Sequence, residues 1–288
     1  MHMTFHKKLI GIFIVVLIIA GILIAQIPNP VQKTDSKTDG ITVPIFMYHE
    51  VKTFKTRKDV ITPGEMESDL KYLKENNYTT INMTDLIRYV DGKGNLPEKP
   101  IILSFDDGYL NNYVYLYPLL KKYNMKIVLS IIGKNTDDFT RIPDNNLDYS
   151  HVTWSQIKEM KESGLVEIQN HTYNMHTMNS KRLGCKKNKN ESSSHYEQVL
   201  TDDIEKLQDE ILTNTGTLPN TFAYPYGKYS NESEAILKKL GFKASLTCDY
   251  GVNIITKDPE KLFGLNRVCR IHGVPIQTAL QKVLKTVK

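Results

Sequence analysis

The chain has 288 residues, and its 37 lysines and arginines exceed its 32 aspartates and glutamates, so the net charge is +5. This small basic excess is spread along the chain without a dense Lys/Arg stripe, which argues against nucleic acid as a partner. The three cysteines include no C-x-x-C pair, so the composition disfavours both a cysteine-based zinc site and a disulfide scaffold.

The N-terminal segment carries a long apolar run. Residues 9–27 form 19 consecutive residues without a charge, which is long enough to cross a bilayer as a helix. Lys7 and Lys8 precede the run, and the positive-inside rule places that end in the cytoplasm. We therefore predict that residues 1–27 are a cytoplasmic tip and a transmembrane anchor that holds the rest of the chain outside the cell, at the cell membrane. The alternative is a cleaved signal peptide, which would make the protein secreted.

Beyond the apolar run, residues 28–42 are polar and rich in breakers, which predicts a flexible linker. From residue 43 to residue 288, strand-like and helix-like spacings of apolar residues alternate. In chain order, the predicted elements are strand 43–49, helix 62–76, strand 78–81, helix 84–90 with Thr84 as its N-cap, strand 101–105, helix 116–123, strand 126–132, helix 155–163, strand 166–169, helix 199–213, strand 221–223, helix 232–240, strand 244–247 and helix 275–284.

This alternation with short connections favours an α/β fold with a parallel sheet. Seven or eight such units in one domain of about 245 residues predict a (β/α) barrel, distorted or incomplete, that follows the N-terminal transmembrane helix. Residues 43–288 are therefore expected to form one domain. Residues 181–194 are polar and lack periodicity, so we expect an exposed loop there.

Two adjacent carboxylates stand at the end of an apolar strand. Residues 104–108 read SFDDG, so the strand runs directly into Asp106 and Asp107. In a barrel, the carboxyl ends of the strands form the active-site face. Neighbouring carboxylates are costly to bring together without a positive charge, and a metal ion supplies one while leaving one acid free as a base. The alternative is a solvated turn, because D-D-G is common turn chemistry.

Two of the eight histidines follow another predicted strand. His171 and His176 lie five residues apart, just after residues 166–169. Imidazoles are common transition-metal ligands, and one loop can direct both at a single ion. A lone histidine is more often structural, whereas two at this spacing favour ligation. One aspartate and two histidines form an open ligand set that leaves a position for water.

A third segment, residues 222–227, reads FAYPYG at the end of a further predicted strand. Such a turn can form the wall of a groove and present a backbone N–H, and aromatic faces suit sugar rings. Tyr224, Pro225 and Tyr226 are therefore candidate substrate contacts. Taken alone, the segment is more typical of a packed turn.

These three motifs, in this order, resemble those of the polysaccharide deacetylases, also called the NodB-homology family or carbohydrate esterase family four. The resemblance covers the chain from about residue 43 to the C-terminus. SFDDG resembles the family's T-F-D-D-G motif, with Ser104 in place of threonine, and residues 171–176 resemble its H-[ST]-x-x-x-H form. Residues 43–49 (VPIFMYH) and FAYPYG resemble the branch that includes the biofilm poly-N-acetylglucosamine deacetylases.

The sequence also departs from the family pattern. The third motif often carries an arginine where this chain has Ala223, so the group that orients the catalytic base must come from elsewhere. Asp249 stands near the weak fourth motif. The fifth motif, L-x-H, supplies a histidine acid, and its best match is residues 270–272, which lack the leucine. His272 is carried over from this match as the expected acid, with a surface histidine as the alternative.

The resemblance implies a hydrolase that acts on carbon–nitrogen bonds other than peptide bonds. It implies a divalent metal held by Asp107, His171 and His176, with Zn²⁺ expected and Co²⁺ or Ni²⁺ as alternatives. Asp106 is then the general base, His272 the general acid, and the backbone N–H of Tyr226 a donor to the oxyanion. The expected reaction releases acetate from N-acetylglucosamine residues of an extracellular or cell-wall polysaccharide, either poly-N-acetylglucosamine or peptidoglycan.

Two other functions remain open at this point. One is a metal-dependent amidase that acts on a small molecule, against which the predicted membrane anchor argues. The other is a non-catalytic carbohydrate-binding protein on the same fold, against which the intact acids and histidines argue.

Overall fold

The structure is a computed structural model that describes residues 40–54, 57–179 and 182–287. The predicted transmembrane anchor, residues 1–27, and nearly all of the predicted linker lie outside the described residues. Within the described part, no helix is both long enough and apolar enough to cross a membrane. The first strand begins at Ile41, slightly before the domain start predicted at residue 43.

An eight-stranded sheet forms the centre of the domain. Its strand order is β10 (Ala244–Leu246), β9 (Thr221–Ala223), β8 (Val166–Asn170), β7 (Ile127–Ile131), β6 (Pro100–Asp107), β2 (Ile45–Tyr48) and β12 (Val268–Cys269), with β5 (Thr79–Thr80) paired to the start of β6. Two further pairs are β1 (Ile41–Val43) with β11 (Asn253–Ile255), and β3 (Glu50–Val51) with β4 (Val60–Ile61).

The large sheet is parallel throughout and curled. Every neighbouring pair along its path runs parallel. Leu265, just before β12, exchanges backbone hydrogen bonds with Ser245 and Thr247 at β10, while β12 itself pairs with β2. The two ends of the strand path are thus drawn toward each other by one segment. The predicted α/β class is confirmed, and the curled sheet is consistent with an incomplete (β/α) barrel.

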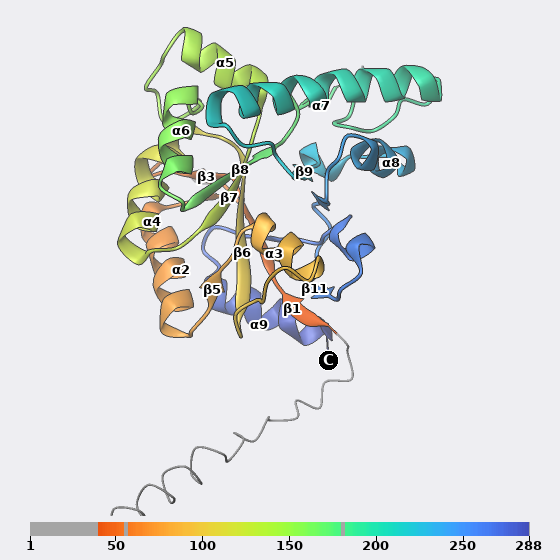
Figure 1. Ribbon diagram of the computed structural model, residues 1–288. Coiled ribbons are helices and arrows are strands. Elements are labelled where there is room, and N and C mark those ends of the chain that lie inside the picture. Colours follow the sequence, from red (N-terminus) through yellow and green to blue (C-terminus); the bar gives the residue numbers. More distant parts are fainter. Residues whose placement is uncertain (1–39, 55–56, 180–181, 288) are drawn as a thin grey trace, which may run out of the picture. The chain divides into compact units, whose positions relative to one another are not determined.

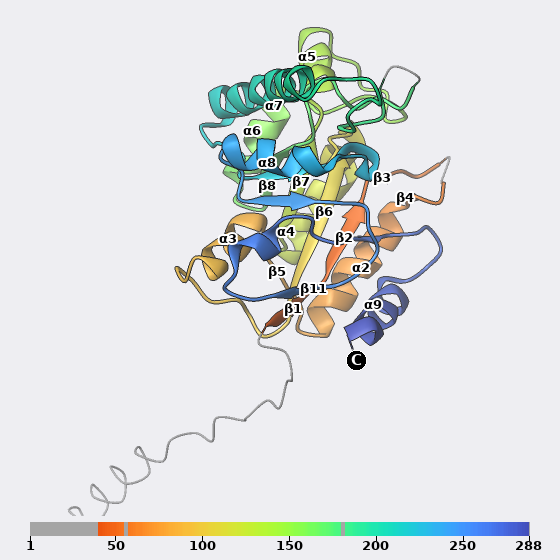
Figure 2. The same cartoon turned by 90° about the vertical axis from the view of Figure 1, so that its right-hand side faces the viewer.

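Helices pack around this sheet (Figure 1). They are α2 (Pro63–Glu75), α3 (Met83–Val90), the π-helix η1 (Asn112–Leu116), α4 (Tyr117–Tyr123), α5 (Gly133–Arg141), α6 (Trp154–Glu162), α7 (Ser193–Thr215), α8 (Asn231–Lys239) and α9 (Ile276–Leu284), with short 3₁₀ turns η2 (Pro225–Gly227), η3 (Pro259–Leu262) and η4 (Lys285–Val287). Figure 1 shows α2 and α4 along one side of the sheet, and the turned view of Figure 2 places α5 and α7 at the end opposite β1.

The helix starts follow local capping chemistry. The Thr62 side chain accepts a hydrogen bond from the Glu65 backbone, the Glu65 carboxylate accepts one from the Thr62 backbone, and Pro63 occupies the first turn of α2. Helix α3 begins in the same way at Asn82, so the N-cap predicted at Thr84 is corrected by two residues. Such a cap stabilises a helix by about 1 kcal/mol.

Strand β6 shows how the two faces of the sheet are filled. Ile101, Leu103 and Phe105 pack in the core cluster that includes helices α2, α4 and α9, whereas Ile102 packs in the cluster on the other face. Both faces of the strand are therefore apolar, which explains why it reads as a continuous apolar run. Alternation along the strand also puts Asp106 on the same face as Ile102, inside the curl.

Several elements differ from the predictions. Helix α5 and strands β11 and β12 were not predicted, because they are short or lack apolar spacing. The helix predicted at 116–123 is preceded by a π-helical turn, and the one predicted at 199–213 extends over Ser193–Thr215, into the end of the predicted loop 181–194.

Candidate active site

The carboxyl ends of neighbouring strands bring the predicted acids and histidines together. Asp107, the last residue of β6, pairs with Ile131 of β7, and Ile131 pairs with Asn170, the last residue of β8. His171 follows Asn170 directly, so Asp107 and His171 stand at one edge of the sheet with a single strand between them.

A cavity of about 250 Å³ opens at this edge. It is lined by His49, Arg57, Asp59, Asp106, Asp107, Tyr109, His171, His176, Tyr226 and Cys248. Both predicted acids, both predicted histidines and one of the three predicted turn residues are therefore at one place. The other half of the lining comes from residues that were not singled out in the sequence.

Asp107, His171 and His176 each offer one ligand atom to a common point. Nε2 of His171 lies 3.4 Å, and Nε2 of His176 3.1 Å, from Oδ1 of Asp107. All three ligand atoms lie within 4.8 Å of one another. Nδ1 of His171 lies 2.7 Å from the carbonyl oxygen of Ala223. Because a carbonyl only accepts, this Nδ1 carries the proton and Nε2 keeps its lone pair.

This arrangement fits a divalent cation. Oδ1 of Asp107 is buried and receives no hydrogen bond, although the Nε2 lone pair of His171 is close to it. Acceptor atoms this close repel one another unless a positive charge lies between them. Ligands bound tetrahedrally at the usual zinc distances stand roughly 3.3 Å apart, close to the separations of both histidines from Asp107. The residues present therefore fit such an ion.

The backbone at Asp107 is strained in a way that serves the site. A regular strand would point Asp106 and Asp107 to opposite faces of the sheet. Asp107 instead has a φ of 72°, in the left-handed region, and Gly108 follows with a φ of 76°. A non-glycine residue in this region costs about 1–3 kcal/mol. The strained turn lets both carboxylates face the same cavity.

Asp106 is held by an arginine from the far end of the chain. Nη1 and Nη2 of Arg267 lie 2.8 Å from Oδ1 and Oδ2 of Asp106, a bidentate pair, and both residues are almost fully buried. Nη1 of Arg267 also donates to Ser104 Oγ at 3.0 Å, and its Nε to the Thr247 carbonyl at 2.6 Å. Burial raises the pKa of Asp106, but Arg267, His171 and His49 together lower it further, so that the pKa is held below its usual range. Arg267 therefore supplies the contact that the motif position of Ala223 lacks.

His49 is a cavity residue that the sequence reasoning missed. It follows β2 directly, as Asp106 and His171 stand at the ends of their strands, and its Nδ1 is buried without a hydrogen-bond partner. The rule that parallel strands share one carboxyl edge is the signal that could have found it.

The structure places His272 elsewhere, which corrects its predicted role. Its Nδ1 lies 2.8 Å from Oε2 of Glu65 on α2, and it is not among the residues that line the cavity. Arg270 forms a buried ion pair with Asp69 of α2, and the Gly273 N–H donates to Glu65. These contacts draw the chain after β12 toward α2 and away from the site.

Of the three predicted turn residues, Tyr226 reaches the cavity. Its hydroxyl lies 3.0 Å from Nδ1 of His176. Tyr224 is only 1% exposed and stacks on Tyr229, with ring centroids 4.5 Å apart, and Pro225 is buried as well. The prediction that Tyr224 and Pro225 contact substrate is therefore corrected: both side chains pack in the interior. Asp249 is not among the residues that line this cavity.

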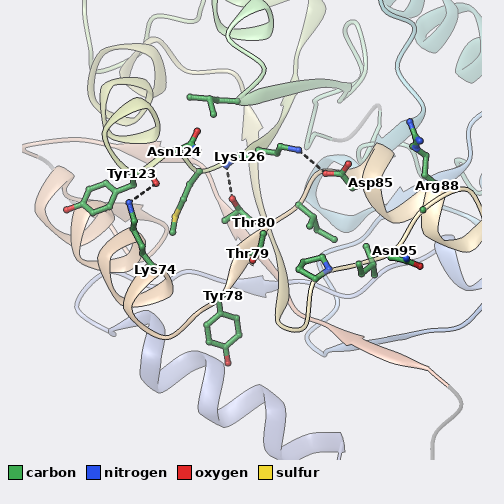
Figure 3. Close-up of a pocket in the computed structure, with 16 residues that line it drawn as sticks. Lys74, Tyr78, Thr79, Thr80, Asp85, Arg88, Asn95, Tyr123, Asn124 and Lys126 are labelled. Carbon is green, nitrogen blue, oxygen red and sulfur yellow. Dashed lines mark hydrogen bonds and ion pairs between the residues drawn. The ribbon is translucent and has the colours of Figure 1, made fainter. Parts of the chain in front are cut away.

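A larger cavity, of about 710 Å³, lies at the opposite end of the sheet (Figure 3). It is lined by residues next to the starts of β5, β6 and β7, and its described lining contains neither histidine nor cysteine. Figure 3 shows Lys126 between its two partners: its Nζ pairs with Asp85 at 3.2 Å and its backbone N–H donates to Thr80. The carboxylate of Asp85 is paired with Lys126, and among the described residues of this lining no three potential ligand side chains come together.

Comparison with known proteins identifies the family of the chain. The family "Polysaccharide deacetylase" matches residues 93–245, more than half of the chain, and the chain belongs to that family. The family consists of hydrolases, so the predicted enzyme class is confirmed.

Individual relatives resemble the chain over most of its length. The YxkH protein of Bacillus subtilis (strain 168) is 28% identical over 226 residues, which cover 78% of this chain and 70% of that protein. The poly-beta-1,6-N-acetyl-D-glucosamine N-deacetylase of Escherichia coli (strain K12) is 26% identical over 242 residues, which cover 78% of this chain and 35% of that protein. The structure of a de-N-acetylase from Aggregatibacter actinomycetemcomitans superposes with a TM-score of 0.71 at 27% identity and covers 86% of this chain and all (100%) of that one.

Proposed function

We propose that the protein hydrolyses the acetamide groups of N-acetylglucosamine residues in an extracellular polysaccharide and releases acetate in a metal-dependent reaction. The observation that carries this proposal is the convergence of Asp107, His171 and His176 on one point beside Asp106, in a single cavity. The similarity to enzymes named for poly-beta-1,6-N-acetyl-D-glucosamine favours that polymer as substrate, with peptidoglycan as the alternative.

A divalent cation held by these three residues, with Zn²⁺ expected and Co²⁺ or Ni²⁺ as alternatives, would polarise the acetamide carbonyl and lower the pKa of a bound water. Asp106 accepts the proton of the attacking water as general base. Its pKa is lowered by Arg267, His171 and His49 in spite of burial, so the carboxylate is ionised at neutral pH. Arg267 also fixes both carboxylate oxygens and thereby orients the base.

The leaving amine needs a proton, and we propose that His49 donates it in place of His272. His49 lines the cavity and its Nδ1 has no competing partner in the described structure. We further propose that the Tyr226 backbone N–H donates to the oxygen that becomes negative. The hydrogen bonds that close this turn are donated by Gly227 and Lys228 and not by Tyr226, which lines the cavity.

We also propose that residues 1–27 anchor the enzyme in the cell membrane with the catalytic domain outside. The support is the 19-residue uncharged run preceded by Lys7 and Lys8. A polymer outside the cell is accessible to an enzyme held in this way.

Acetate release from poly-N-acetylglucosamine oligomers tests the proposal. The purified protein is assayed as isolated, after removal of metal with a chelator, and after addition of Zn²⁺ or Co²⁺. We expect release that is lost with chelator and restored by metal. Metal binding with release from peptidoglycan fragments alone would change the substrate, and release from N-acetylated monomers alone would favour a small-molecule amidase. Glycan binding without metal or acetate release would favour a carbohydrate-binding protein.

A further inference from the structure

The loop that carries both histidine ligands is held on two sides by other elements. Its carbonyl groups at Thr172 and Tyr173 accept hydrogen bonds from the N–H groups of Gly133 and Lys134, the first residues of α5, at 3.1 Å and 2.8 Å. These contacts satisfy N–H groups that a helix start leaves unpaired. They fix one edge of the loop.

The other edge is held by a single carboxylate on α7. Oδ1 of Asp203 accepts the backbone N–H of Tyr173, and Oδ2 accepts that of Asn174, each at 2.8 Å. Both of these peptides lie between His171 and His176. A carboxylate is acceptor-only and can accept two N–H groups with its two oxygens, which no neutral side chain does.

Asp203 keeps this position although its surroundings disfavour its charge. Burial raises its pKa to about 6, and the two backbone N–H groups and Lys206 offset burial only in part. The Tyr173 side chain is held as well, since its hydroxyl donates to Asp137 of α5 at 3.0 Å and Lys206 lies over its ring. A costly carboxylate of α7 that is bound to the ligand loop is better explained by the geometry it imposes on that loop than by the stability it adds.

We infer that Asp203 is a positioning residue for the metal site: its carboxylate holds the loop between His171 and His176 so that both Nε2 atoms face Asp107. The inference rests on the proposed metal-dependent function. Replacement of a residue that orients metal ligands from outside the coordination shell typically lowers metal affinity about 10- to 100-fold. Asp203 orients both histidines through the backbone of Tyr173 and Asn174.

Metal titration of the purified protein tests the inference. Asp203→Asn is compared with wild type at constant pH near 8, with Co²⁺ as the probe and with the Co²⁺ absorption spectrum, affinity and melting temperature as readouts. An asparagine offers one oxygen, so one of the two N–H groups faces an NH₂ group instead. We expect Co²⁺ affinity to fall about 10- to 100-fold and the spectrum to change, while the metal-free protein melts within a few degrees of wild type.

Two further variants complete the test. Asp209→Asn removes an exposed carboxylate from the same helix and is expected to leave Co²⁺ affinity and spectrum unchanged. Asp203→Glu restores two oxygens and is expected to recover part of the affinity. Wild-type affinity and spectrum in Asp203→Asn overturn the inference, as does a loss of affinity that accompanies an equal loss of metal-free stability. Failure of the wild type itself to bind Co²⁺ instead overturns the proposed metal-dependent function.

Discussion

The two ends of the curled sheet hold cavities that differ in size and in chemistry. The amino end has the larger one, about 710 Å³ against about 250 Å³ at the carboxyl end. At the amino end, Lys126 and Asp85 pair with each other. At the carboxyl end, Asp107 and two histidines bring possible ligand atoms together, and Asp107 Oδ1 receives no hydrogen bond. A choice of active site by cavity size alone would therefore fall on the amino end. The carboxyl end is identified instead by its ligand atoms, which need a cation between them.

Two acids at opposite ends of the sheet also differ in how their charge is compensated. At the carboxyl end, Arg267, with His171 and His49, offsets burial and lowers the pKa of Asp106. At the amino end, Glu167 of β8 accepts the backbone N–H groups of Met83 and Thr84 at 2.8 Å and 3.0 Å, and burial raises its pKa. A full positive charge next to Asp106 keeps that acid ionised, as a general base requires. Glu167 instead accepts hydrogen bonds from neutral N–H groups at the start of a helix, and its role is structural.

The largest expected effect separates the two ends by matched substitutions of aspartate. Asp106→Asn removes the proposed base, so we expect acetate release to fall by roughly 10³-fold, with bound metal retained because Asp107 and both histidines are unchanged. Asp85→Asn makes the same change beside the larger cavity and should leave the rate within about twofold of wild type. Acetate release and metal content are measured on both proteins.

A near wild-type rate in Asp106→Asn would remove Asp106 from its proposed role. A comparable loss in Asp85→Asn would instead break the contrast between the two ends.

A smaller effect decides which histidine acts as the acid. His49→Gln removes the histidine in the cavity, and we expect kcat to fall about 10²-fold. His272→Gln removes the histidine that pairs with Glu65, outside the cavity, and we expect a rate close to wild type. The measurement is kcat for both variants on the same oligomer. The reverse ranking would restore the assignment made from the L-x-H resemblance.

These expectations show what the sequence could and could not reveal. Asp106, Asp107, His171 and His176 were found because each stands in or next to a strand end, and parallel strands bring their carboxyl ends to one edge. Those relations are local in the chain. The partner of Asp106 was not found because Arg267 reaches it from the position just before β12, a strand of two residues whose place depends on the curl of the whole sheet.

The same distinction applies to the fold. Helix α2 was predicted nearly to the residue, since its capping box and apolar spacing are both written in adjacent residues. Helix α5 was missed because Gly133 and Thr136 are its buried residues, and neither gives an apolar pattern. His272 was misplaced for a long-range reason, because the buried pair of Arg270 with Asp69 decides where the last part of the chain lies.

The smallest expected effect concerns stability at the amino end. Because the folded pKa of Glu167 is raised above its unfolded value, its contribution to stability is fully present below the unfolded pKa and is lost as pH rises through the folded pKa. Glu167→Gln cannot titrate, so the difference in melting temperature, variant minus wild type, should become more positive between about pH 5 and about pH 8, by a few degrees. Metal loss and other titrations act on both proteins alike and cancel in this difference.

Acetate release near pH 8 should stay at the wild-type level, because Glu167 contacts the start of α3 and not the metal ligands. A difference in melting temperature that stays constant with pH would show that the Glu167 charge is compensated as fully as that of Asp106, and the contrast between the two ends of the sheet would then lie in their cavities alone.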